Sequence, residues 1–159
     1  MSGIESKAHM SPIVRTVCGW ISGFILLYGI QVVLYGHLSP GGGFTGGVIA
    51  AIGFVLAIVV QGEGAADNTF SRRAASVLDC VGALLFWLMA ILGIAVTGIF
   101  FFNFLATPTE ARLTLFSAGI IPGCNAAIGL KVCSSIYLIV LVLAALAAPD
   151  RPQKKESNK

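Results

Sequence analysis

Charged residues are scarce in this 159-residue chain: Asp, Glu, Lys and Arg together make up 11% of it, whereas 57% of the residues are hydrophobic. Soluble domains are about one-quarter charged, so this chain has too little charge to cover a water-facing surface. It is also too apolar to remain unfolded, with a mean hydropathy of +0.91. The composition excludes both a soluble catalytic domain and a disordered segment.

The few charges are unevenly distributed along the chain. Residues 18–62 and residues 80–109 contain no Asp, Glu, Lys or Arg, and residues 113–149 contain only Lys131. A charge at the centre of a bilayer costs at least about 2.5 kcal/mol on insertion scales. Long charge-free stretches are therefore typical of membrane-spanning segments, and the sequence predicts an integral membrane protein.

About 20 apolar helical residues cross the hydrocarbon core of a bilayer. We predict an all-α, polytopic membrane protein with four transmembrane helices, at residues 14–35, 44–61, 77–104 and 125–148. The third segment exceeds the bilayer thickness, which predicts a tilted helix or an interfacial end. A cleaved signal peptide is disfavoured for the first segment, because its apolar run is too long and no small-residue cleavage site follows.

Basic residues outside these segments predict the orientation, because cytoplasmic connections are enriched in Lys and Arg. Eight of them fall on one side of a four-span topology, namely Lys7, Arg15, Arg72, Arg73, Arg151, Lys154, Lys155 and Lys159. Arg112 stands alone on the other side. We therefore expect a multi-pass protein of the cytoplasmic (inner) cell membrane with both termini cytoplasmic. Its domains would be an N-terminal tail (residues 1–12), one four-helix membrane domain (13–149) and a basic tail (150–159).

Cysteine and histidine usage gives no sign of metal or redox chemistry. The four cysteines have no CxxC spacing, and no His stands at a metal-ligand spacing. We predict that they are small apolar side chains within the spans. Nucleophile–base pairs and cofactor motifs are absent from the sequence as well, so we predict no catalytic residue, no metal and no cofactor.

A glycine-rich connection, residues 35–47, joins the first two spans. It holds six glycines, Pro40, and the polar side chains of His37 and Ser39. Glycine permits positive φ and close backbone approach, and Pro40 biases Ser39 away from helix, so we predict a sharp helix break. Its residues Gly36, Pro40, Gly41, Gly42, Gly43, Phe44, Gly46 and Gly47 form the predicted helix-break and packing motif.

Two interpretations of this connection stay open. It is either a turn that packs two helices closely or an element of an ion or proton path, with His37 and Ser39 beside the free N–H groups that begin the second helix. The small residues Gly46, Ala50, Gly53 and Ala57 continue the packing pattern. Gly19 and Gly23 form a similar GxxxG face on the first span.

Lys131 is the one charge within the last span, and an intramembrane charge is a functional hypothesis by default. On a helical wheel it shares a face with Cys124, Ile128 and Ser135, whereas Asn125 points away. We expect this face to turn toward protein or water, and Lys131 and Ser135 are candidates for an ion or proton path. Pairing of Lys131 with a carboxylate of a neighbouring subunit, or snorkelling to lipid phosphate, is the alternative.

Asp79 opens the third predicted span on the opposite side of the membrane from Lys131. We therefore expect that Asp79 does not pair with Lys131. Its neighbours Arg72 and Arg73 make an interfacial anchor the favoured interpretation.

The string GHLSPGGGFTGGV resembles the signature of the MnhB family, the B subunit of Mrp-type (Mnh or Sha) multisubunit cation/proton antiporters. The segment GIIPG at residues 119–123, followed by IGLKV at 128–132, is similar to the family's second conserved stretch. Thr45 departs from the Gln that is common in the family, and residues 122–125 depart from its usual run. Related modules occur in membrane-bound hydrogenases, so the kind of host complex stays open.

The resemblance implies an accessory membrane subunit of a multisubunit Na⁺ (or K⁺)/H⁺ antiporter. Such a subunit would pack between larger membrane subunits and contribute to a hydrated ion or proton path. One alternative is a subunit in the ion-translocating arm of a redox-driven complex such as a membrane-bound hydrogenase. The other is a purely structural spacer. In each case the partners would be membrane subunits and the lipid bilayer, with Na⁺ or K⁺ and H⁺ as transported ions and no nucleic acid.

Overall fold

The computed structural model describes residues 11–38, 40–61, 71–105 and 118–147. Within them the chain is helical, with four helices, α1 (Pro12–Leu34), α2 (Gly42–Gln61), α4 (Arg72–Thr97) and α5 (Ile121–Ala147). Each is long and apolar enough to cross a membrane. The predicted all-α fold with four membrane-spanning helices is confirmed.

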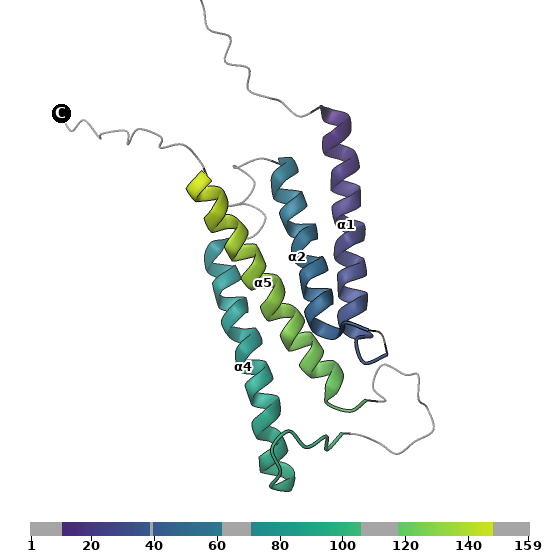
Figure 1. Cartoon of the computed structure of the whole chain (residues 1–159), viewed down its shortest axis with the longest axis vertical. Helices are drawn as coiled ribbons and strands as arrows, with labels where there is room; N and C mark the ends of the chain where they lie inside the picture. Colours follow the sequence, from purple (N-terminus) through teal and green to yellow (C-terminus); the bar gives the residue numbers. More distant parts are fainter. Residues whose placement is uncertain (1–10, 39, 62–70, 106–117, 148–159) are drawn as a thin grey trace, which may run out of the picture.

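The helices pack as a bundle in which α2 and α5 form the centre (Figure 1). α1 packs mainly against α2, and α4 packs against α5. The first turn of α1 and the last turn of α5 lie at the same end of the bundle (Figure 1). The two ends of the helical domain therefore lie on one side of the membrane, and the assignment of that side to the cytoplasm stays a prediction.

Small residues bring α1 and α2 into backbone contact. A Cβ atom added at Gly29 of α1 would lie 2.8 Å from the backbone nitrogen of Ala50 on α2. One added at Gly46 would lie 2.7 Å from the backbone nitrogen of Val33. The buried Ser22 hydroxyl also donates a hydrogen bond of 2.7 Å to the carbonyl of Gly53. Close packing of this kind is how membrane helices associate without a hydrophobic driving force.

The neighbouring glycine, Gly47, lies on the side of α2 that contacts α5. A Cβ atom there would lie 2.7 Å from the carbonyl oxygen of Gly129 on α5. Successive helical residues point about 100° apart, so the Gly46–Gly47 pair allows α2 to approach α1 and α5 at the same level. The double glycine thus places α2 at the centre of the bundle.

The buried core lies where α2, α4 and α5 meet. Tyr137 is 2% exposed and packs with Ala75 and Leu141. The ring of Phe54 meets the Tyr137 ring edge-on, with centroids 6.2 Å apart. Most other large apolar side chains are exposed, as expected for helices that face lipid or other membrane proteins.

The helix ends differ from the predicted spans at α4 and α5. α4 begins at Arg72 rather than at residue 77 and ends at Thr97, where Gly98 adopts φ +77°. The segment 99–105 folds back onto α4, because a Cβ atom at Gly93 would lie 2.8 Å from the Phe102 nitrogen. The predicted helix to residue 104 is wrong, since a left-handed glycine is a common helix terminator.

α5 begins at Ile121 rather than at residue 125, and Pro122 lies in its first turn. Backbone N–H groups in the first turn have no acceptor within the helix, so the missing N–H of proline costs no hydrogen bond there. Asn103 supports this start from the segment after α4. Its side-chain oxygen accepts the Ile120 N–H at 2.9 Å, and its amide nitrogen donates to the Ala118 carbonyl at 2.8 Å. The side-chain amide of Asn103 thus connects the segment 99–105, which follows α4, to the beginning of α5.

Candidate functional site

Lys131 of α5 and Asp79 of α4 form an ion pair. The Lys131 ammonium nitrogen donates to the Asp79 Oδ1 atom at 2.9 Å. The prediction that these residues do not pair is wrong. Asp79 bonds to Lys131, while Arg72, which precedes it in the chain, donates to the carbonyl of Leu141 at 3.1 Å.

The reason for the error is the position of the helix ends. Because α4 begins at Arg72, Asp79 lies ~10 Å inside the helix at 1.5 Å per residue. Because α5 begins at Ile121, Lys131 lies ~15 Å from that helix's start. The two helices run in opposite directions (Figure 1), and they cross where Gly82 of α4 lies against the backbone of Lys131 on α5, so Asp79 comes within reach of Lys131.

Ser135 completes the group. Its hydroxyl donates a hydrogen bond to the same Asp79 Oδ1 atom. Lys131 and Ser135 are one helical turn apart and therefore lie on the same face of α5. We refer to Lys131, Asp79 and Ser135 as the Lys131 cluster.

Gly82 brings the two helices close enough for these contacts. A Cβ atom at Gly82 would lie 2.8 Å from the Lys131 backbone nitrogen and 2.9 Å from the Ala127 carbonyl oxygen. Asp79 precedes Gly82 by three residues, so it lies on the same side of α4. The glycine thus sets the backbone separation at which a short Asp side chain reaches both Lys131 and Ser135.

The Lys131 cluster is electrically neutral overall but not fully enclosed by this chain. The Lys131 side chain is 46% exposed and that of Asp79 is 27% exposed. An ammonium–carboxylate pair stabilises each charge against the low dielectric of a membrane, and an exchangeable proton remains on the ammonium. Such a pair of charges can attract a passing ion.

The glycine-rich turn lies nearer to the beginning of α5. Gly41 and Gly42 adopt φ of +116° and +57°, a conformation that few other residues tolerate. The Gly43 N–H, at the beginning of α2, donates to the side-chain oxygen of Asn125 at 3.4 Å. Asn125 therefore faces α2 and not the side of Lys131, as the helical wheel predicts.

The structure does not bring all candidate residues together. His37 and Pro40 lie in the turn between α1 and α2, whereas Ser39 falls outside the described residues. The turn contacts α5 at Asn125, six residues and therefore ~9 Å before Lys131. The turn and the Lys131 cluster thus occupy successive levels of the bundle.

Sequence reasoning missed Asp79 as a member of the site. A signal was available, because Ala75, Asp79 and Gly82 follow each other at helical spacing. An acidic residue in line with small residues lies on a close helix contact. Only the helix start at Arg72 places that contact at the level of Lys131.

The four cysteines do not pair with one another. Cys18, Cys80, Cys124 and Cys133 are free thiols. In the part of the chain that the structure describes, no three His, Cys, Asp or Glu side chains gather into a group that could hold a metal ion.

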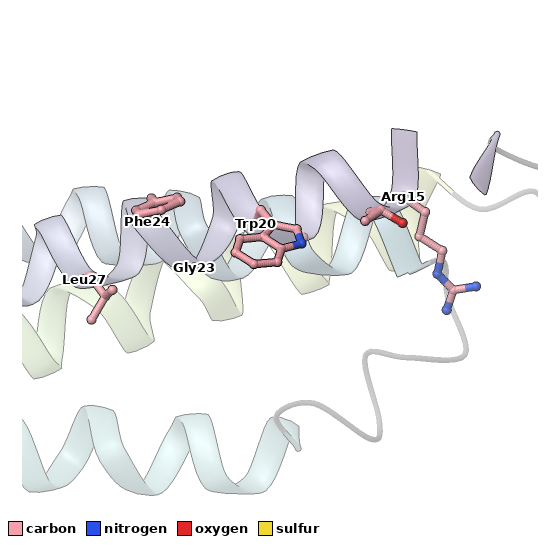
Figure 2. Close-up of a pocket in the computed structure, with 7 residues that line it drawn as sticks. Arg15, Trp20, Gly23, Phe24 and Leu27 are labelled. Carbon is pink, nitrogen blue, oxygen red and sulfur yellow. The ribbon is translucent and has the colours of Figure 1, made fainter. Parts of the chain in front are cut away.

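Within the described residues, the GxxxG face of α1 packs against no other helix. A Cβ atom at Gly19 or Gly23 would have no atom within 4 Å among the described residues. The two glycines lie in an open groove on the outside of α1, which also includes Trp20 and Phe24 (Figure 2). Close packing of α1 within the chain depends instead on Ser22 and Gly29.

Comparison with known proteins decides the family. A family model described as the domain related to the MnhB subunit of Na⁺/H⁺ antiporters matches residues 13–138. The chain belongs to this family. The match covers all four helices apart from the ends of α1 and α5, and it confirms the resemblance found in the glycine-rich string.

A relative is known from Methanocaldococcus jannaschii. The uncharacterized protein MJ1307 is 33% identical over 145 residues, which is 89% of this chain and 55% of that protein. The chain thus spans little more than half the length of this relative. Membership in the MnhB family makes the chain a relative of antiporter subunits, and the role of its own residues is a separate question.

Proposed function

We propose that this chain is an accessory membrane subunit of a multisubunit antiporter that exchanges Na⁺ or K⁺ for H⁺. We further propose that the Lys131 cluster is part of the hydrated path along which protons cross it. The observation that carries the proposal is the Lys131–Asp79 pair at 2.9 Å, which joins two helices long and apolar enough to cross a membrane and lies ~10–15 Å from their first residues. Charged groups at this depth are costly and mark ion pathways, proton relays or essential contacts.

In this path Lys131 is the proton carrier. Its ammonium releases a proton to water in the path, and the neutral amine takes up another from the opposite side. Asp79 stabilises the protonated form through its carboxylate, and the Ser135 hydroxyl holds Asp79 in position by donating to the same oxygen. A lysine suits this task because its ammonium can lose a proton, whereas the guanidinium of arginine stays protonated.

The glycine-rich turn would serve the end of the path. We assign His37, whose imidazole can donate and accept a proton, and Ser39 to proton or cation entry. The free N–H groups that begin α2 belong to the same connection. Replacing His37 with Gln should slow exchange without reducing the amount of assembled complex.

Ion exchange in membrane vesicles tests the proposed function. The complete complex would be produced in a host that lacks its own antiporters, with and without this chain. Everted vesicles are then energised, and the collapse of the pH gradient is followed after addition of Na⁺ or K⁺. We expect exchange only when this chain is present, and the cation that gives it identifies the substrate.

Two results would contradict the proposal. Proton movement that requires an electron donor, with no response to Na⁺ or K⁺, would instead assign the chain to a redox-driven complex. Normal exchange by complexes with Lys131→Met or His37→Gln would leave the chain as a structural spacer.

A further inference from the structure

The face of the bundle on which the Lys131 cluster is exposed carries charge at a depth where lipid is apolar. Ser76, Asp79 and Ala83 lie on this face of α4, and Lys131, Ser135 and Val142 lie on the adjoining face of α5. We refer to these six residues as the Lys131 face. Nearly half of the Lys131 side chain is exposed there.

Acyl chains cannot solvate that ammonium group. Lysine has three N–H donors, and within the described residues one of them is used, by Asp79. Lys131 lies ~15 Å along α5 from the nearer helix end, too deep for full hydration by the interface. The remaining donors therefore need acceptors that come from outside this chain.

A partner helix is able to approach the Lys131 face closely. Ser76 and Ala83 flank Asp79 at spacings of three and four residues, and both are small and exposed. Small residues at such spacing let a second helix come close enough for side-chain hydrogen bonds. The backbone carbonyls of that helix are occupied by its own hydrogen bonds, so the acceptor that such a helix offers is a side chain.

The geometry points to a docking surface for a transmembrane helix of a neighbouring subunit that presents an Asp or Glu carboxylate to Lys131. An acidic side chain suits the exposed donors, because the more exposed partner of the pair is the cation, with 46% exposure against 27% for Asp79. The inference rests on the proposed function, since it assumes that the chain works within a complex. Lys131 would then hold one carboxylate within its own chain and one from its neighbour.

An exchange of the two charges separates docking from an internal role. The double variant Asp79→Lys, Lys131→Asp keeps the internal ion pair but turns an anion toward the neighbour. We expect this variant in the membrane at wild-type amount, with its recovery in the affinity-purified complex reduced roughly tenfold or more by like-charge repulsion. Recovery at the wild-type level would overturn the inference.

A photoreactive side chain tests the same surface without disturbing the pair. Benzoylphenylalanine would replace Ala83, and in a matched control it would replace Leu85, which lies two residues further and ~200° around α4. Leu85 is exposed as well. In the purified complex, position 83 should form an adduct with a membrane segment that contains Asp or Glu, and position 85 should not form the same adduct. An assembled complex without an adduct at position 83 would refute the docking surface.

The outcomes also separate this inference from the proposed function. If the charge exchange leaves assembly intact but abolishes cation/proton exchange, the docking surface is wrong and the proton path stands. If position 83 is cross-linked to an acidic membrane segment in a complex that shows no cation/proton exchange, the docking surface stands and the antiporter role is wrong.

Discussion

Replacement of Gly82 with Ala is the most direct test of how the helices are held together. The added Cβ would lie 2.8 Å from the backbone nitrogen of Lys131 and 2.9 Å from the Cβ atom of Lys131. Atoms in good contact lie about 3.5–4.0 Å apart, so the methyl group would overlap with α5 by roughly 1 Å. The neighbouring atoms are backbone and Cβ atoms, which cannot move without the whole helix.

The expected cost follows from this overlap. Overpacking of a well-packed contact costs about 1–3 kcal/mol, and we expect Gly82→Ala to lower the free energy of unfolding by that amount. Displacement of α5 would also lengthen the Lys131–Asp79 contact, because Gly82 sets its separation. Exchange activity of the assembled complex should therefore fall together with stability.

Unfolding by SDS in mixed detergent micelles measures this free energy, with helical circular dichroism as the signal. Gly23→Ala is the matched control, because a Cβ atom there meets nothing within 4 Å among the described residues. Its effect should stay within about 0.5 kcal/mol. Equal stability of the two variants would refute the account of helix packing between α4 and α5.

Three further substitutions test other contacts by the same unfolding assay. Asn103→Ala should cost about 1–3 kcal/mol, because it leaves the Ile120 N–H and the Ala118 carbonyl unpaired; an unchanged value would show that Asn103 does not support the start of α5. Ser22→Ala should cost about 0.6 kcal/mol, the typical value for a hydrogen bond between membrane helices, and a loss above 2 kcal/mol would point to a larger role. Gly41→Ala should cost about 1–3 kcal/mol because of its φ of +116°, whereas a stabilised variant would contradict the described turn.

The sequence predicts the number of helices well because charge is excluded from the hydrocarbon core over long stretches. It predicts their ends poorly, because a helix continues wherever backbone hydrogen bonds can form. Arg72 and Arg73 belong to α4 although they are charged, and Pro122 fits the first turn of α5. Hydropathy alone places both boundaries inside the true helix.

These small boundary errors have a large effect on the site. Lys131 and Ser135 stand out in the sequence as polar residues on one face of an apolar helix. The sequence places its partner, Asp79, at the opposite interface, because hydropathy predicts that the helix begins at residue 77. Pairing between distant segments depends on depth and on the crossing point at Gly82, and neither can be read from the periodicity of one helix.

The glycine-rich connection shows what a motif can and cannot reveal. Its composition predicts a helix break and close packing, and the positive φ values of Gly41 and Gly42 give the physical reason. Gly46 faces α1 and Gly47 faces α5. These separate contacts can be identified only when the positions of all three helices are known.

Cation/proton exchange by complexes that carry Lys131→Arg tests the central claim most directly. Arginine keeps the positive charge beside Asp79 and toward a neighbouring subunit, but it does not release a proton. In everted vesicles that hold equal amounts of assembled complex, we predict that the rate of exchange falls roughly tenfold or more relative to wild type, because the carrier stays protonated. A rate equal to that of the wild type would contradict proton transfer through Lys131.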